Sequence, residues 1–110
     1  MISLDGAICY LSGPMSGLHE MNRPFFNHVQ NLILSTFKIK VVINPARQSH
    51  DLTWQETMVI DLEDIRSKAT CIVLLPGWHL SKGAKLEVHL AISLGIPLIT
   101  YEELMSEILK

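Results

Sequence analysis

The sequence predicts an α/β fold, a Rossmann-like or flavodoxin-like three-layer sandwich built on a mostly parallel sheet of four to five strands. Two observations support this prediction. Short apolar runs alternate along the chain with longer segments whose apolar residues recur at helical spacing. The runs themselves are apolar throughout, which is typical of strands buried on both faces of a parallel sheet. Ligands bind such folds beyond the carboxyl ends of the strands, so we expect the functional site in the loops there.

The first half of the chain contains two predicted strands and one predicted helix. Residues 7–11 form an apolar run that ends in a Ser-Gly-Pro turn, and we expect this strand to lie centrally in the sheet. Residues 25–37 carry apolar side chains at helical spacing, and Pro24 is acceptable in the first turn of a helix. Residues 40–43 form the second strand, which ends at an Asn-Pro pair.

The second half repeats the alternation of helix and strand. Thr53 and Glu56 have the spacing of a capping box, which predicts that a helix begins there and runs to about Ala69. Gly95 is suited to the C-cap of the helix that follows Ser81. The remaining elements are predicted strands at 71–75 and 96–100 and a terminal helix at 102–109.

Length and composition are typical of one domain, residues 1–110, with 48% hydrophobic and 18% charged residues. A net charge of −2 without runs of like charge argues against a nucleic-acid polymer as partner. We expect no membrane span and a cytoplasmic location. Cys9 and Cys71 each lie in an apolar run and are expected to be buried thiols. The five histidines lack metal-ligand spacing, so no metal site and no cofactor are expected.

Glu87 is the strongest candidate for a catalytic residue. At 100° per residue it lies roughly 200° around its helix from Lys85, on the same side as Ala84 and Val88. Burial of an unpaired carboxylate is costly, so such a group is normally paired, protonated or used in chemistry.

Asp61 is the second candidate, because it falls within the apolar stripe of the helix that follows Thr53. Asp64 lies outside this stripe, four residues before Lys68, where a solvated ion pair explains it. For Asp61 the alternative interpretation is a carboxylate satisfied by the amides of a neighbouring loop.

Three further features lie in the loops at the carboxyl ends of the predicted strands. The glycines and hydroxyls of residues 12–17 are able to cradle a sugar or a phosphate, although a plain tight turn explains them equally well. Ser81 precedes the helix of Glu87, where it can cap the helix or help to hold an anion. Trp78 is either an ordinary core aromatic or one wall of a pocket that stacks on a base.

Four segments carry a joint signal in their order and spacing. They are YLSGPMSG at 10–17, NPA at 44–46, DL at 61–62 and LPGWHLSKGAKLE at 75–87. Together these segments resemble the nucleoside 2-deoxyribosyltransferase-like superfamily. More closely, the chain is similar to the small phage and bacterial domains of unknown function of the DUF4406-like type, and to 2′-deoxynucleoside 5′-phosphate N-hydrolases. The resemblance covers nearly the whole chain.

The resemblance implies cleavage of the N-glycosidic bond of a 2′-deoxynucleoside or its 5′-monophosphate in the cytoplasm, or in the host cytoplasm for a phage protein. Glu87 matches the nucleophilic glutamate, Asp61 the residue that protonates or positions the departing base, and Ser81 the 5′-phosphate ligand. Because the sequence ends at Lys110, without the C-terminal extension of the transferases, hydrolysis is expected to prevail over base exchange. The expected substrate-binding residues are Tyr10, Ser12, Gly13, Pro14, Met15, Ser16, Gly17, Asn44, Trp78, Ser81 and Gly83.

Two expectations concern partners. The alternative to an enzyme is a module that binds or sequesters a nucleotide without turnover, since the fold alone does not define chemistry. Leu86, Leu90 and Leu94 form a second apolar row on the helix of Glu87, which predicts a homodimer or a higher homo-oligomer.

Overall fold

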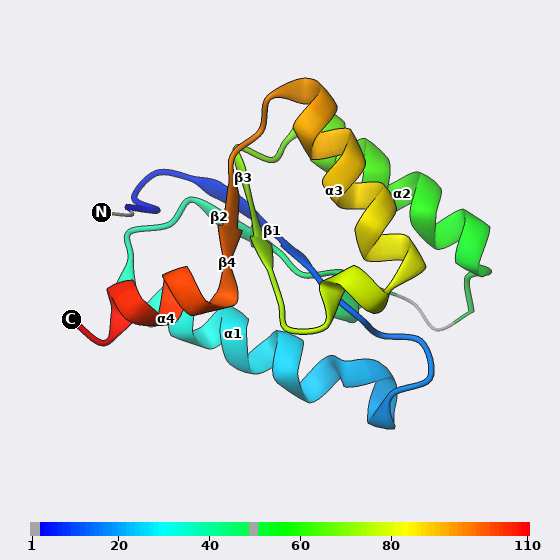
Figure 1. The fold of residues 1–110 in the computed structure, drawn as a ribbon, viewed down its shortest axis with the longest axis horizontal. Coiled ribbons are helices and arrows are strands. Elements are labelled where there is room, and N and C mark those ends of the chain that lie inside the picture. Colours follow the sequence, from blue (N-terminus) through cyan, green and yellow to red (C-terminus); the bar gives the residue numbers. More distant parts are fainter. Residues whose placement is uncertain (1–2, 49–50) are drawn as a thin grey trace.

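The computed structural model describes residues 3–48 and 51–110, and in these residues it contains one four-stranded sheet in which every pairing is parallel (Figure 1). The strand order is β2-β1-β3-β4, so the first strand is central as predicted. Cys9 of β1 is in register with Val42 of β2 on one side and with Cys71 of β3 on the other. The strands are β1 (Ile8–Ser12), β2 (Val41–Ile43), β3 (Cys71–Leu74) and β4 (Leu98–Thr100).

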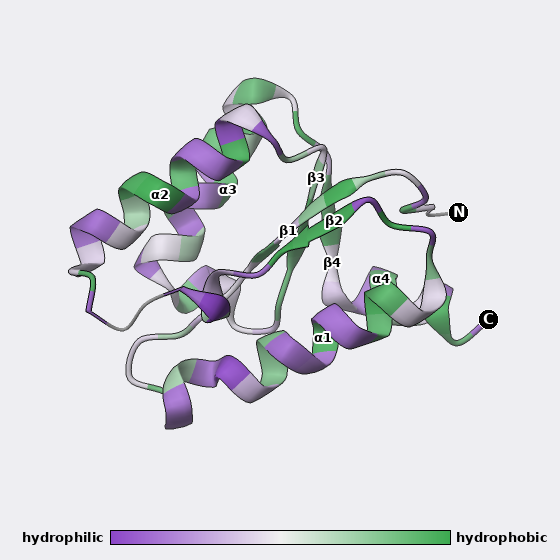
Figure 2. Cartoon of the chain, turned by 180° about the vertical axis from the view of Figure 1, so that it is seen from behind, coloured by the Kyte–Doolittle hydropathy of each residue, from purple (hydrophilic) through white to green (hydrophobic). Residues whose placement is uncertain are grey.

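Helices cover both faces of the sheet, which confirms the predicted three-layer α/β sandwich. Helices α1 (Arg23–Thr36) and α4 (Tyr101–Ile108) lie on one face. Helices α2 (Trp54–Ser67) and α3 (Lys82–Leu94) lie side by side on the other face, and both views show this pairing (Figures 1 and 2). Both α2 and α3 return from the carboxyl edge of the sheet to its amino edge, so they run in the same direction.

Side chains of β1 alternate between the two layers, as the period of a strand requires. Cys9 and Leu11 belong to the core beneath α1 and α4, and both are fully buried. Tyr10 points the other way, into the core beneath α2 and α3, together with Ile72. Both cysteines are free and buried, as expected. The alternation directs the hydroxyl of Tyr10 toward α3.

Local signals fix most of the element boundaries. Thr53 forms the predicted capping box with Glu56, and Thr100 forms a second one with Glu103 that starts α4. Gly95 caps α3 with a φ of 72°, a conformation that favours glycine. The last strand is shorter than predicted because the Ile96 amide donates a hydrogen bond of 2.9 Å to the Ala91 carbonyl and so completes the end of α3.

The carboxyl edge of the sheet carries three short 3₁₀ turns, one in each loop that follows the first three strands. They are η1 (His19–Asn22), η2 (Pro45–Arg47) and η3 (Trp78–Leu80). In the described part of the chain, no helix is both long and apolar enough to cross a membrane.

Candidate functional site

A cavity of about 450 Å³ lies at the carboxyl edge of the sheet, where the loop after β1 meets the first turns of α2 and α3. Both predicted carboxylates, Asp61 and Glu87, line it. Its position agrees with the general rule for ligand sites in parallel α/β sheets. The rest of the wall consists of Leu11, Gly13, Pro14, Met15, Ser16, Met21, Arg23, Phe26, Pro45, Gln48, Leu52, Trp54, Thr57, Met58, Leu80, Ser81, Lys82, Gly83 and Ala84.

Glu87 is held by two hydroxyl groups from the central strand. Tyr10 Oη donates a hydrogen bond of 2.6 Å to Oε2, and Ser12 Oγ donates one of 2.7 Å to Oε1. Tyr10 and Ser12 are two residues apart on β1, so both side chains point to the α3 layer. Only 5% of Glu87 is exposed. The inward orientation predicted from the helical period is therefore confirmed.

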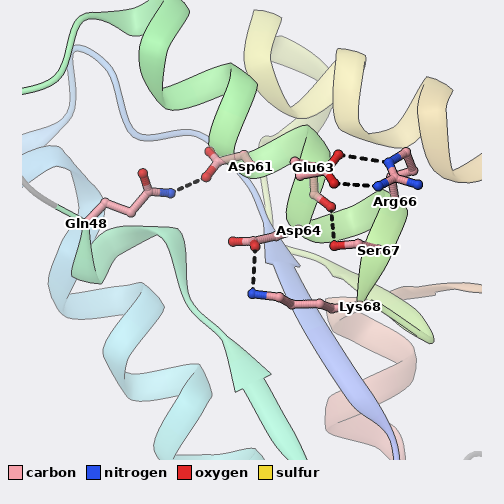
Figure 3. A network of polar contacts seen from close by, with 7 residues as sticks. All are labelled: Gln48, Asp61, Glu63, Asp64, Arg66, Ser67 and Lys68. Atoms are coloured by element: carbon pink, nitrogen blue, oxygen red, sulfur yellow. Dashed lines mark hydrogen bonds and ion pairs between the residues drawn. The ribbon is translucent and has the colours of Figure 1, made fainter.

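Asp61 lies two turns into α2 and only 4% of it is exposed. Its Oδ1 accepts a hydrogen bond from Nε2 of Gln48, which follows η2. Figure 3 shows Asp61 turned toward Gln48, whereas Glu63 is turned away toward Arg66. The alternative interpretation, in which loop amides satisfy the carboxylate of Asp61, therefore holds in part, because a side-chain amide from a loop binds it. Asp61 nevertheless lines the cavity.

Asp64 serves as a contrast on the same helix. Its Oδ1 lies 3.2 Å from Nζ of Lys68, and the lysine side chain is 62% exposed. Figure 3 shows this pair apart from Asp61. The predicted separation of the two aspartates, one surface ion pair and one inward acid, is confirmed.

The two buried carboxyl groups share an electrostatic environment. Burial raises the pKa of Glu87 to about 8; the hydrogen bonds from Tyr10 and Ser12 oppose this rise, and the charge of Asp61 adds to it. Burial raises the pKa of Asp61 to about 6, against the lowering effects of Gln48 and Tyr10. Between these values the pair holds one proton, as expected for two neighbouring acids in a dry site.

Tyr10 joins the two acids. Its pKa is raised well above the usual value, first by burial and then by the negative charges of Glu87 and Asp61, so the hydroxyl stays protonated. A protonated phenol in contact with both carboxyl groups can donate to either one. Tyr10 therefore belongs to the acid pair although it forms no part of the cavity wall.

Two positively charged side chains, Arg23 and Lys82, line the cavity. Arg23, at the start of α1, donates from Nε to the Ala46 carbonyl at 3.1 Å, which fixes its side chain at the wall. Lys82, at the start of α3, lies with Nζ 4.7 Å from the centre of the Trp54 ring. The amino end of α3 adds its own favourable field for an anion.

Ser81 caps α3, as predicted, by accepting a hydrogen bond of 3.2 Å from the Ala84 amide through its Oγ. It also lines the cavity. The hydroxyl is thus both a helix cap and a wall group, and the two interpretations left open from the sequence are compatible.

Two glycines in the predicted site make close packing possible. A Cβ atom at Gly13 would lie 2.7 Å from Cβ of Leu75, so the loop after β1 approaches the end of β3 more closely than a side chain permits. A Cβ atom at Gly83 would lie 3.2 Å from Sδ of Met58, which packs α3 against α2 at the cavity wall. Pro14, Met15 and Ser16 also line the cavity.

Five predicted site residues lie outside the cavity wall. Two of them, Tyr10 and Ser12, hold Glu87 from behind the wall. Gly17 is exposed and has a φ of 81°. Asn44 is buried and supports η2 by accepting from the Ala46 amide, while its own amide donates to Asn27 and Gln30. Trp78 packs against the core beneath α2 and α3. Of its two interpretations, the core aromatic is the one that matches its position.

Sequence reasoning missed four wall residues that carry a charge, an amide or an indole ring. Gln48 comes from the end of a loop whose approach to the cavity depends on tertiary packing. Arg23, Trp54 and Lys82 each stand at the first position of a helix that begins at the carboxyl edge of the sheet. That position is a signal from which all three could have been found. The four residues are Arg23, Gln48, Trp54 and Lys82.

In chemical terms the site offers two acids with displaced pKa values, a neutral phenol and hydroxyl, two cations and an amide. Among the described residues, no group of three or more His, Cys, Asp or Glu side chains is arranged to hold a metal ion. Within this set of groups, the arrangement is suited to acid–base and nucleophilic chemistry by carboxyl groups.

Fold and site define an α/β protein of the Rossmann-like class with a carboxylate-lined cavity at the carboxyl edge of its parallel sheet. The family model of the domain of unknown function DUF4406 matches residues 7–100, and the chain belongs to this family. No curated protein matches the sequence.

Proposed function

We propose that the protein cleaves the N-glycosidic bond of a 2′-deoxynucleoside or its 5′-monophosphate. The observation that carries the proposal is the buried Glu87, whose two oxygens are held by Tyr10 and Ser12 at the wall of a cavity that also contains Asp61. Two acids at one cavity are the basic requirement for glycoside cleavage with a covalent intermediate. The family match covers the four sequence segments that carry the resemblance to deoxyribosyltransferases and nucleotide hydrolases.

In the proposed first step, Glu87 attacks the anomeric carbon of the sugar. The bond between this carbon and the base nitrogen breaks, its electron pair leaves with the base, and Asp61 gives the base a proton. A covalent ester between Glu87 and the sugar results. In the second step a water molecule gives its proton to Asp61 and attacks the same carbon, which releases the sugar and restores both acids. Attack by a second base in place of water would give base exchange.

The mechanism requires the shared proton on Asp61, whereas the higher pKa of Glu87 places it on Glu87 in this structure. Positive charge that develops on the sugar carbon stabilises the ionised form of Glu87. The proton then moves to Asp61, either directly or with the hydroxyl of Tyr10 as intermediary. Substrate binding thereby generates the nucleophile and the acid together.

The cations favour a nucleotide over a nucleoside. The cavity wall carries positive charge from Arg23, Lys82 and the amino end of α3. The two acids of the wall, Asp61 and Glu87, are both buried, so no exposed acid of the wall balances this charge. A 5′-phosphate is the group of a nucleotide that such charges bind best.

Chromatography of the products from a panel of deoxynucleoside and ribonucleoside monophosphates and free nucleosides tests the proposal. Wild-type protein should release base, and Glu87→Ala should release none. If neither releases base, with or without acceptor bases, the enzymatic proposal is wrong. Ligand-induced stabilisation of Glu87→Gln by the same compounds would then identify a nucleotide-binding module without turnover.

A further inference from the structure

The two acids of the cavity have hydrogen-bond partners of different chemical kinds. Glu87 is held by two hydroxyl groups, those of Tyr10 and Ser12. Asp61 is held by the amide of Gln48, whose Nε2 donates to Oδ1. A hydroxyl group can both donate and accept, whereas an amide NH₂ group only donates. The two acids therefore differ in how well each can hold a proton.

At Asp61 the partner favours the ionised form. The NH₂ group of Gln48 binds a charged carboxylate oxygen more strongly than the oxygen of a neutral acid, so protonation of Asp61 weakens this bond. Figure 3 shows the amide nitrogen of Gln48 directed at Asp61 and the amide oxygen turned away. In the described part of the chain this oxygen, Oε1, is buried without a hydrogen-bond partner. The amide thus forgoes one contact and keeps its donor on Asp61.

At Glu87 the partners suit either form. When Glu87 is protonated at Oε1, the Ser12 hydroxyl 2.7 Å away can accept the hydrogen bond that it otherwise donates. Tyr10 continues to donate to Oε2. Burial does not distinguish the two acids, because 5% of Glu87 and 4% of Asp61 is exposed. The chemical kind of the partner therefore decides between them.

We infer that Gln48 is a positioning residue that determines which acid holds the shared proton: with its amide nitrogen on Asp61, it keeps the proton on Glu87 in the free protein. The direction of the pKa values agrees, since that of Glu87 is raised to about 8 and that of Asp61 to about 6. The bond from Gln48 is the largest of the effects that lower the pKa of Asp61. Half a turn of the amide would bring Oε1 to Asp61 and favour the proton there instead.

The titratable groups that face Asp61 from its own helix and from the sheet do not explain this preference. Asp64 lies one turn away on α2, and its negative charge raises the pKa of Asp61, which favours a proton on Asp61. Tyr10 reaches the pair from β1 and lowers the pKa of both Asp61 and Glu87. Neither residue therefore holds the proton on Glu87 alone.

The cations of the cavity do not explain it either. Arg23 and Lys82 line the wall that also contains Asp61 and Glu87. Within the described residues, neither cation forms an ion pair with either acid. Gln48 is thus the neighbour that stabilises a negative charge on Asp61 and does not touch Glu87.

The location of the proton has a consequence that rests on the proposed function. A protonated Glu87 is a poor nucleophile, so Gln48 keeps the site unreactive until a substrate draws the proton to Asp61. The location itself is a property of the free protein. It holds whether or not the protein cleaves a glycosidic bond, and it is measured without substrate.

Carbon-13 NMR of the carboxyl carbons of the full chain, titrated from about pH 4 to about pH 10, tests the inference. Glu87→Gln and Asp61→Asn assign the two signals. In wild type, Asp61 should ionise first and Glu87 second. Gln48→Met keeps the length of the side chain without the donor, and it should raise the midpoint of Asp61 by about one unit or more, with no matching rise for Glu87.

Gln48→Lys supplies a positively charged donor, so it should move the midpoint of Asp61 in the opposite direction. Gln55→Met is the matched control, because Gln55 is exposed on α2 outside the cavity wall and its loss should move neither midpoint.

Three results would overturn the inference. The first is a wild-type protein in which Glu87 ionises before Asp61. The second is an unchanged midpoint of Asp61 in a Gln48→Met variant that circular dichroism shows to be folded. The third is an equal rise of both midpoints in this variant, which would assign Gln48 a role in excluding water from the pair. Absence of base release from every substrate would refute the glycosidase and leave this titration unaffected.

Discussion

The Tyr10 hydroxyl lies 2.6 Å from Oε2 of Glu87 and so links the centre of the sheet to the second turn of α3. The contact joins residues 77 positions apart in sequence, and both are buried. It lowers the pKa of the carboxyl group against the larger effect of burial. Tyr10 thus controls how much of Glu87 is ionised near neutral pH.

Tyr10→Phe should lower base release at pH 7 by about tenfold or more. Without the phenol, the pKa of Glu87 rises further above about 8, and each unit of increase lowers the ionised fraction about tenfold. Ser12→Ala removes the second donor and should act in the same direction. Rates of both variants measured from pH 6 to pH 9 should stay below those of wild type throughout, because a pH high enough to ionise Glu87 leaves Asp61 ionised as well. The other tyrosine, Tyr101, packs against Phe25 on the opposite layer, so Tyr101→Phe is the control.

The pH dependence of kcat/KM should be bell-shaped, with limbs near pH 6 and pH 8. Below the lower limb both Asp61 and Glu87 are protonated and the nucleophile is lost. Above the upper limb both are ionised, and no acid remains to protonate the leaving base. Asp61→Asn should be slow and should lose the alkaline decline. A flat wild-type profile between pH 5 and pH 9 would show that the pair does not act as proposed.

The sequence was sufficient for the fold and for the two acids, because both depend on local periodicity. Helical spacing alone turns Glu87 and Asp61 inward, and a central parallel strand brings Tyr10 and Ser12 to the same side. These are properties of single elements. Their burial in the structure follows from the helix and strand periods without knowledge of tertiary contacts.

Contacts between secondary-structure elements could not be predicted from the sequence. The bond from Gln48 to Asp61 depends on the path of the loop after β2, which no local pattern determines. The two tryptophans show the same limit. Helical spacing places Trp54 in the apolar stripe of α2. In the structure it is the first residue of this helix, is 37% exposed and lines the cavity. Trp78, for which the sequence left a core aromatic and a pocket wall both open, packs against the core.

Arg23→Gln should separate nucleotide binding from nucleoside binding. If the guanidinium binds the 5′-phosphate, its loss should raise KM for a monophosphate by about tenfold to a hundredfold, the usual range for a charge-assisted hydrogen bond. KM for the corresponding nucleoside should stay within about twofold. Arg47→Gln is the matched control, because Arg47 is exposed on η2 and lies outside the cavity wall. Equal increases for both substrates would assign Arg23 a structural role through the Ala46 carbonyl.

Glu87→Gln should stabilise the protein at high pH and have little effect on stability at low pH. Burial raises the pKa of Glu87 from an ordinary 4.5 to about 8 in the folded state. A raised pKa favours folding while the folded carboxyl is protonated, and this contribution is lost as pH rises from about 4.5 through about 8. Above that range the wild-type fold holds a buried charge, at a cost on the order of 3–5 kcal/mol that the neutral amide avoids.

Urea denaturation of wild type and Glu87→Gln at pH 4.5 and pH 9 measures this difference. The free energy of unfolding of the variant should exceed that of wild type only at pH 9, because a glutamine keeps the shape of the carboxyl group and the hydroxyls of Tyr10 and Ser12 can reorient toward it. Glu102→Gln, an exposed residue of α4, should show no comparable pH-dependent gain. A variant that is less stable than wild type at pH 9 would mean that the hydrogen bonds to the ionised carboxylate outweigh the cost of its burial.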